Sequence, residues 1–298
     1  MSRFQIERRP AILVTRLTAA PKLMIFQLAA PSPALSPYVR HYQLIHFVFA
    51  GGAPRPVKPY PPRPEQCLIF YPRDPLTIEY LATGQKIRQP RSIVSGQVVS
   101  RQNLHIGDDY IVLKVVFYPG ALFHLVQLPF TEITDSNVDA ESVFGPGMRQ
   151  LNERLGSTSE LPAMVALVEA FLLRRLRMTQ NAAGPLDQVA RLLLYRPEAF
   201  SLDYLAAESC LSPRQFQRRF SQQVGVSPKW FSRISRFDRA FRLKCSHPGL
   251  DWLQIAVQTG YQDYQHLAKE FAEFAGVRPN VLVREESSSP DRYFGFRE

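Results

Sequence analysis

Arginine and glutamine side chains line one side of a short predicted helix in the last third of the 298-residue chain. In the stretch LSPRQFQRRFSQQVGVSP (211–228), Arg214, Gln217 and Arg218 recur at three- and four-residue spacing, which places them on one helix face. Arginine can form paired hydrogen bonds with the guanine edge in the DNA major groove, and glutamine with the adenine edge. This acid-free face therefore favours binding to DNA, and a merely solvated helix face is the alternative.

The opposite face of the same helix is apolar. Its side chains recur every four residues, at Phe216, Phe220 and Val224. Ser212 is a favourable N-cap, and Gly225 can adopt the positive φ that ends a helix. The pattern predicts a helix that buries one face in a small core and leaves the other exposed.

The C-terminal third contains an internal repeat. Residues 205–228 match residues 255–279, with an offset of 50 before the turn and 51 after it. In the second copy, the apolar positions are Leu267, Phe271 and either Phe274 or Ala275, and the polar face carries Gln265, Ala268 and Lys269. Each copy predicts two helices joined by a turn, which is a helix-turn-helix unit. The repetition makes a merely solvated face much less favoured.

One long helix is predicted between the two copies, over residues 228–245. At 1.5 Å per residue it would span about 26 Å, comparable with the ~34 Å between successive major-groove faces on one side of B-DNA. Residues 184–250 contain eleven Lys or Arg against five Asp or Glu, a net of six positive charges. Six of these basic residues lie in the helix: Lys229, Arg233, Arg236, Arg239, Arg242 and Lys244.

These motifs resemble the DNA-binding domain of AraC-type transcriptional regulators over residues 186–284. The resemblance implies an all-α domain of two helix-turn-helix units joined by a long helix, which contact adjacent major grooves. It assigns DNA contacts to Arg214, Gln217, Arg218, Gln265 and Lys269. Three nearby residues are weaker candidates, namely Gln262, Tyr264 and His266. A structural capping or packing role is the alternative for His266.

Cys210 departs from the family pattern, which usually has glycine in the first turn, as Gly260 is in the second copy. A positive φ at cysteine is strained, so we expect the first turn to have a different shape. A redox-sensing thiol is the less favoured alternative, because the acidic neighbours Asp203 and Glu208 do not favour a thiolate.

The first 145 residues predict a β-rich domain. Short strand-like runs occur at 66–72, 76–84 and 110–120, separated by glycine- and proline-rich turns. This pattern is typical of a β barrel or sandwich. The segments FQLAAPSPALSPYVRHYQ and VVFYPGALFHLVQLPFTEITD resemble the cupin-like sensor domains of AraC-type regulators, whose known roles are effector binding and dimerisation. The predicted class of the whole chain is therefore α+β.

Residues 146–180 predict helices that flank the β domain. One of them has an apolar stripe, formed by Met164, Leu167, Val168, Phe171 and Leu172. Self-association and docking on the β domain explain the stripe equally well. The predicted division is a sensor domain at 1–145, a helical segment at 146–180, a linker at 181–185, the DNA-binding domain at 186–284 and a tail at 285–298.

No motif in the sequence predicts catalysis, a metal site or a cofactor. The histidines of the first half lack the spacing of metal-binding cupins, and no phosphate loop, nucleophile elbow or CxxC pair occurs. The three cysteines are far apart, as in a protein with reduced thiols. Aromatic side chains could line a pocket of the β domain or form its core: Tyr42, Phe47, Phe70, Tyr71, Phe117 and Tyr118.

The chain carries a formal net charge of +10, which favours a polyanionic partner. No apolar run is long enough to span a bilayer, and the first residues lack the pattern of a secretion signal, so we expect a cytoplasmic protein without membrane partners. The expected partners are double-stranded DNA, a small-molecule effector, a second copy of the chain and, for an activator, RNA polymerase. An effector-independent DNA-binding protein and a catalytic β domain fused to a DNA-binding domain are the alternatives.

Overall fold

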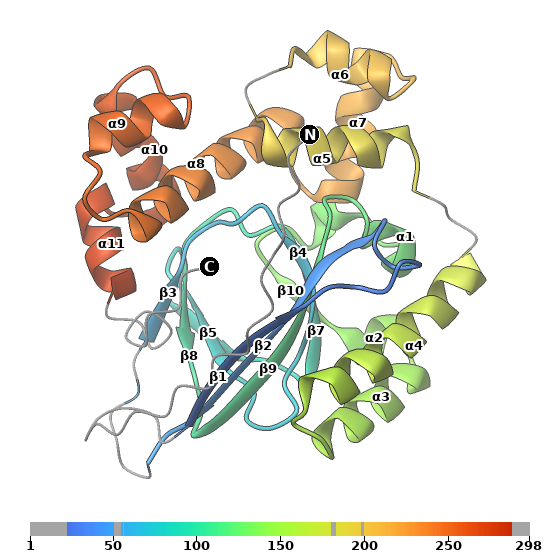
Figure 1. The fold of residues 1–298 in the computed structure, drawn as a ribbon. Helices are drawn as coiled ribbons and strands as arrows, with labels where there is room; N and C mark the ends of the chain where they lie inside the picture. The colour runs from blue at the N-terminus through green and yellow to red at the C-terminus, as the bar shows by residue number, and fades with distance from the viewer. Residues whose placement is uncertain (1–22, 51–54, 56, 180–182, 198–199, 288–298) are drawn as a thin grey trace.

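The structure is a computed structural model that describes residues 23–50, 55, 57–179, 183–197 and 200–287 (Figure 1). Three of the sequence-based expectations fall outside this range. They concern residues 1–22 at the start of the chain, residues 181–182 of the predicted linker and the tail from residue 288.

Six antiparallel strands form the larger sheet, in the order β1-β2-β9-β4-β7-β10. They are β1 (Leu23–Ala29), β2 (Val39–Val48), β4 (Gln66–Phe70), β7 (Ser92–Ser95), β9 (Asp109–Phe117) and β10 (Asn137–Asp139). Strand β9 is buried along almost its whole length, because both of its faces are covered. Its nearly continuous apolar sequence YIVLKVVF is typical of such a strand.

Four antiparallel strands form the smaller sheet, in the order β3-β8-β5-β6. They are β3 (Val57–Tyr60), β5 (Thr77–Tyr80), β6 (Gln85–Arg88) and β8 (Gln102–His105). A hairpin joins β5 to β6, and Gly84 in its predicted turn has a φ of +71°. All four residues of β6 are exposed, as suits a strand at the edge of a sheet.

The two sheets lie face to face and enclose a core between them. This core contains side chains from both sheets, such as Phe47 and Val112 from the larger and Ile78 from the smaller. Of the two predicted architectures, the sandwich is confirmed and the barrel is wrong. A barrel requires its edge strands to pair with each other, whereas in the described residues β1 pairs with β2 alone and the three-residue β10 with β7 alone.

Helices cover the outer face of the larger sheet (Figure 1). They are α1 (Phe123–Val126), the 3₁₀ helix η1 (Phe130–Glu132), α2 (Ala140–Phe144), α3 (Pro146–Gly156) and α4 (Leu161–Thr179). From the apolar stripe of α4, Met164, Val168 and Leu172 are completely buried in the core beneath this face. The stripe thus docks α4 on its own β domain, one of the two alternatives that the sequence left open.

The C-terminal domain is entirely helical in its described residues, as predicted. Its helices are α5 (Pro185–Tyr195), α6 (Leu202–Glu208), α7 (Pro213–Val224), α8 (Pro228–Ser246), α9 (Trp252–Gln258), α10 (Tyr264–Ala275) and α11 (Pro279–Ser287). The long helix α8 connects the pair α6–α7 to the pair α9–α10 (Figure 1). No helix in the described part of the chain combines the length and the apolar character needed to cross a membrane.

Candidate nucleic-acid interface

The repeat folds into two helix-turn-helix units of matching geometry. Unit 1 consists of α6 and α7, and unit 2 consists of α9 and α10. Residues 201–210 and 251–260 have the same order of buried and exposed positions. Ser209 and Thr259, which occupy equivalent positions, both donate their hydroxyl groups to a carbonyl one turn earlier, at 2.8 and 2.6 Å.

The turns of both units pass through the left-handed region of backbone conformation. Cys210 has a φ of 55°, and Gly260, its equivalent, has a φ of 81°. The amide of the following residue donates to Ala206 O at 3.0 Å in unit 1 and to Ala256 O at 2.9 Å in unit 2. The expectation of a differently shaped first turn is therefore wrong. The exposed Cys210 accepts the strained conformation, because the same hydrogen bonds fix the backbone in both turns.

Capping residues position the second helix of each unit. Ser212 Oγ accepts from the amide of Gln215, whose side chain accepts in return from the Ser212 amide, and Gly225 ends α7 with a φ of 96°. In unit 2, Asp263 accepts from the His266 amide at 2.7 Å, and Gly276 ends α10 with a φ of 69°. The predicted cap and stop of α7 are thus confirmed.

Both predicted apolar stripes are buried against α8. Phe216, Phe220 and Val224 form the core of unit 1 together with Phe231 of α8. In unit 2, the buried side chains of α10 are Leu267, Phe271, Phe274 and Ala275, which pack with Ile234 and Phe237 of α8. One helix therefore supplies part of both cores and fixes the two units relative to each other.

The opposite faces of α7 and α10 are exposed and are called here the recognition faces. They contain Arg214, Gln217 and Arg218 in unit 1, and Gln265 and Lys269 in unit 2, all exposed. With the offset of 51, Gln265 is equivalent to Arg214, and Lys269 to Arg218. The sheet domain leaves both faces exposed, and within the described residues neither Arg214 nor Arg218 makes an ion pair.

The three weaker candidates divide into two groups. Gln262 and Tyr264 are exposed beside the recognition face of unit 2. His266 is half-buried, and its ring packs edge-on against Tyr261 with 5.2 Å between ring centroids. His266 thus has the packing role that the sequence left as an alternative.

Most basic side chains of α8 bond within the molecule. Arg242 pairs with Asp238 at 2.6 Å, and Arg239 donates to the Gln258 carbonyl at 3.0 Å. Lys244 donates to the Leu250 carbonyl at 2.5 Å. These basic residues of α8 therefore stabilise the fold. Lys229, at the N-terminal end of the helix, is exposed.

A buried carboxylate in unit 2 was not predicted from the sequence. Glu270 is only 3% exposed and pairs with Arg233 at 2.9 Å and with Arg236 at 2.6 Å. It also accepts a hydrogen bond of 2.8 Å from Tyr261. Burial alone would raise the pKa of Glu270, but the two arginines outweigh it and lower the pKa. Glu270 lies one position after Lys269 and on the buried side of α10, so it holds unit 2 together from within.

Unit 1 docks on the sheet domain through the C-terminal end of α7. Gln66 donates to the Gln223 carbonyl at 2.8 Å and accepts from the Gly120 amide at 2.8 Å. Thr134 donates its hydroxyl to the Gly225 carbonyl at 2.7 Å. Gly225 lies so close that an added Cβ would be 3.0 Å from Thr134 Oγ1. Glycine at this position therefore allows the positive φ that ends the helix and also allows the close contact between the domains.

Further contacts tie the helical domain to the sheet domain. His124 of α1 lies 2.9 Å from Asp187 of α5, and Arg101 pairs with Glu285 of α11 at 2.7 Å. Val99, in the loop between β7 and β8, packs against the cores of both units. These contacts join residues far apart in the sequence, and no sequence motif predicts them.

The sandwich encloses a cavity of about 80 Å³ between its two sheets. Of the six aromatic candidates, Phe47 and Tyr71 line it. Tyr42, Phe70 and Phe117 point to the opposite face of the larger sheet and belong to the core beneath the helices, and Tyr118 packs against that core. For these four the core alternative holds, because neighbouring residues of a strand face opposite sides.

The histidines of the sheet domain lie beside separate carboxylates. His46 contacts Asp109 and His105 contacts Glu79, at 2.8 and 2.9 Å. Among the described residues, no group of three or more histidine, cysteine or acidic side chains could hold a metal ion. The structure thus points to the helix-turn-helix units and the cavity as the places where a partner could bind.

Comparison with known proteins finds a family model that matches part of each domain. Residues 205–285 match the family described as a helix-turn-helix domain, and residues 27–139 match a domain of unknown function (DUF6597). The HTH-type transcriptional regulator MtrA of Neisseria gonorrhoeae is 29% identical over 101 residues, which are 34% of this chain and 33% of MtrA. The match thus spans about a third of that relative's length.

Solved structures of ToxT from Vibrio cholerae are distantly similar to part of the chain. One, from strain O395, has a TM-score of 0.44 at 9% identity and covers 78% of this chain and 95% of that one. Another, with a bound unsaturated fatty acid, has a TM-score of 0.43 at 10% identity and covers 77% and 91%. Likenesses at this level assign no ligand. The helix-turn-helix match over residues 205–285 confirms the resemblance found in the sequence, which is to an AraC-type helix-turn-helix domain.

Proposed function

We propose that this protein is a sequence-specific, DNA-binding transcription regulator whose helices α7 and α10 enter adjacent major grooves. The observation that carries the proposal is the equivalence of the two recognition faces. Both are exposed and rich in hydrogen-bond donors, and each lies opposite a buried apolar stripe on the same helix. Two helices with matching geometry and with exposed donors at equivalent positions suit two successive segments of one duplex.

The length of α8 supports contact with adjacent grooves. Its 19 residues span about 28 Å, and the major groove returns to the same side of B-DNA after ~34 Å. Because side chains of α8 lie in both cores, the distance between α7 and α10 is fixed before DNA binds. Such preorganisation lowers the entropic cost of association.

The side chains of the recognition faces have distinct expected roles. Arg214 and Arg218 suit the guanine O6/N7 edge, and Gln217 and Gln265 suit the adenine N6/N7 edge. Lys269 can bind guanine or a phosphate. The richer chemistry of unit 1 suggests that it contributes more to sequence preference than unit 2.

The sheet domain is proposed to control DNA binding. The cavity between its sheets supports the proposal of a small-molecule effector. Further proposed partners are a second copy of the chain and, for an activator, RNA polymerase. The proposed domain limits are 1–145, 146–180, 181–185, 186–284 and 285–298. The start of α3 at Pro146 supports the limit after residue 145, and the start of α5 at Pro185 supports a limit near residue 185, whereas α11 runs to Ser287 and crosses the proposed limit after residue 284. The proposed location is the cytoplasm.

A sheet domain that uses a cysteine as its catalytic nucleophile is disfavoured by the environment of Cys67. Cys67 is buried, and burial raises the pKa of its thiol to about 12. A nucleophilic cysteine needs a lowered pKa.

An effector-independent DNA-binding protein remains the alternative. A thermal-shift screen would favour it if no compound both stabilised the protein and altered its affinity for DNA.

The experiment that tests the function starts from the natural binding site. DNA fragments captured from the genome by the full-length protein define this site, and its affinity is then measured for Arg218→Ala. Loss of a bidentate contact should weaken binding by ~1–3 kcal/mol and relax the preference at one base pair. Arg154→Ala, an equal change of charge at an exposed position of α3, is the matched control. Equal affinity of the two variants would contradict the groove assignment.

A further inference from the structure

The cavity in the sandwich is apolar at one end and polar at the other. Its apolar walls include Ile45, Phe47, Ile69, Ile78, Leu104 and Val112. Along β9, Lys114, Val112 and Tyr110 face the cavity in turn, and their partners on β2 are Gln43, Ile45 and Phe47. With ~3.3 Å per residue, the polar pair and the aromatic pair are about 13 Å apart.

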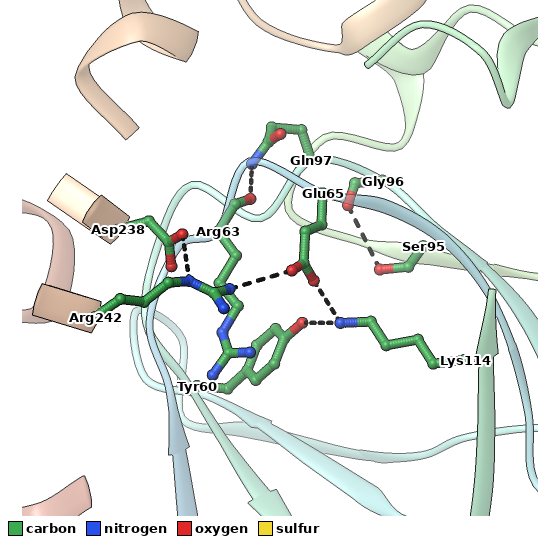
Figure 2. Close-up of polar contacts among 9 residues, drawn as sticks. All are labelled: Tyr60, Arg63, Glu65, Ser95, Gly96, Gln97, Lys114, Asp238 and Arg242. Atoms are coloured by element: carbon green, nitrogen blue, oxygen red, sulfur yellow. Dashed lines mark hydrogen bonds and ion pairs between the residues drawn. The ribbon is translucent and has the colours of Figure 1, made fainter. Parts of the chain in front are cut away.

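The charged side chains that line the cavity have one sign. Among the lining residues, all of them described, Lys58, Arg63 and Lys114 are basic and none is acidic. Lys114 Nζ donates to Tyr60 Oη at 3.0 Å and to Glu65 Oε2 at 2.5 Å (Figure 2). An ammonium group has three donors, and the third interacts with the Cys67 thiol, a weak acceptor that an anion in the cavity can replace. The Tyr60 hydroxyl, which accepts from Lys114, can donate its own hydrogen to the same molecule.

Glu65 connects this end of the cavity to the helical domain. One of its carboxylate oxygens bonds to Lys114, and the other lies 3.3 Å from Arg242 of α8, which also pairs with Asp238 (Figure 2). Burial alone would raise the pKa of Glu65, but the charges of Lys114, Arg63 and Arg242 outweigh it and hold the pKa well below its usual value. Glu65 is therefore ionised and shared between the cavity wall and α8.

We infer that the cavity binds a small organic anion with an apolar body, whose charged group is held by Lys114 and Tyr60, and that Glu65 and Arg242 transmit its presence to α8. A bound anion would share Lys114 with Glu65. The repulsion between the two negative charges displaces Glu65 relative to Lys114 and alters its ion pair with Arg242. The transmission step rests on the proposed function as a regulator, whereas the ligand class rests on the cavity alone.

The ligand class is tested with hexanoate and with hexanamide, a neutral molecule of the same shape. Calorimetric titration of the full-length protein should give a dissociation constant for hexanoate about tenfold below that for hexanamide, because a charge-assisted hydrogen bond is stronger than a neutral one. Lys114→Met should remove this preference. Glu65→Gln should tighten hexanoate binding about threefold or more and change hexanamide binding by less, because it removes a charge that competes with the anion.

A double variant, Lys114→Met with Glu65→Gln, tests the ligand class if the single lysine variant does not fold. It leaves neither buried charge without its partner. Equal affinities of the acid and the amide for the natural protein, or no binding of either, would overturn the proposed ligand class. A preference for the acid that survives the loss of Lys114 would overturn it as well.

The proposed transmission from Glu65 to α8 is tested separately by tryptophan fluorescence. The two tryptophans of the chain, Trp230 and Trp252, lie in α8 and α9, and Lys244 of α8 lies over the Trp252 ring at 5.4 Å. Hexanoate should change tryptophan emission in the natural protein. In Arg242→Met it should bind with a dissociation constant within about threefold of the natural value and leave the emission unchanged. An unchanged emission in the natural protein, or an equal change in Arg242→Met, would overturn the connection. None of these titrations contains DNA, so their failure is distinguishable from a failure of DNA binding.

Discussion

The two helix-turn-helix units share a backbone and an exposed chemistry but are stabilised in different ways. At the position equivalent to the buried Glu270 of unit 2, unit 1 has the exposed Arg219. Gly225 of unit 1 is pressed against the sheet domain, whereas an added Cβ at Gly276 of unit 2 would meet no atom within 4 Å. The comparison teaches that recognition depends on the repeated turn and stripe, while the remaining positions of each helix adapt to different neighbours.

The largest expected difference between the units concerns the buried carboxylate. Glu270→Gln should lower the free energy of unfolding by about 2–3 kcal/mol, because it leaves Arg233 and Arg236 without their shared buried counter-charge. Arg219→Gln, the same position in unit 1, should change it by less than about 0.5 kcal/mol. Urea unfolding followed by tryptophan fluorescence measures both. Equal effects would show that the units do not differ in this respect.

The next difference concerns the two glycines that end α7 and α10. Gly276→Ala should cost about 1 kcal/mol, because its positive φ strains any residue with a Cβ. Gly225→Ala should cost about 2 kcal/mol, because its Cβ would also lie 3.1 Å from the Phe130 carbonyl oxygen. Melting temperatures of the two variants decide the matter. A greater loss for Gly276→Ala would contradict the assigned contact between domains.

A smaller effect is expected in the turn of unit 1. Cys210→Gly should raise the free energy of unfolding by up to about 1 kcal/mol, because glycine adopts the left-handed conformation without strain. Cys210→Ala retains the Cβ and serves as the control, with no gain expected. Chemical denaturation of the three proteins gives the comparison, and a gain shared by both variants would point to the thiol instead of the backbone.

The smallest expected effect is a pH dependence. The folded pKa of Glu270 is lowered, so its stabilisation is complete above the unfolded pKa of about 4.3 and is lost as the pH falls toward the folded pKa. Between pH 7 and pH 4, the difference in unfolding free energy between the natural protein and Glu270→Gln should shrink by about 0.5 kcal/mol. Unfolding curves at both pH values measure it, and a difference that grew on acidification would contradict the lowered pKa.

The sequence predicted those features that depend on local patterns. The stripe through Phe216 and Phe220, the cap at Ser212 and the stop at Gly225 all lie within one helix, so their spacing alone reveals them. The exposure of the five predicted DNA-contacting residues follows from the same spacing, while their contacts with DNA stay a prediction. The likeness of the sheet domain to cupin domains also stays a prediction.

The features that the sequence did not predict depend on contacts across long stretches of chain. Glu270 lies among exposed-looking polar residues, and its burial is decided by Arg233 and Arg236, more than thirty positions earlier. The choice between a sandwich and a barrel depends on which edge strands meet. Cys210 shows a different limit, because its intrinsic strain was predicted correctly but the hydrogen bonds that impose it were not.

The partly buried Val99 packs against both helix-turn-helix cores at once and so brings the sheet domain into contact with each of them. A chimera that joined the helical domain to a foreign sensor would therefore need an apolar side chain at the same place, or both units would lose packing together. Removal of the sheet domain by cleavage before α5 would expose to water the surfaces of both units that Val99 contacts. The C-terminal domain therefore cannot be exchanged between proteins without loss, because the sheet domain supplies an apolar contact to both of its units.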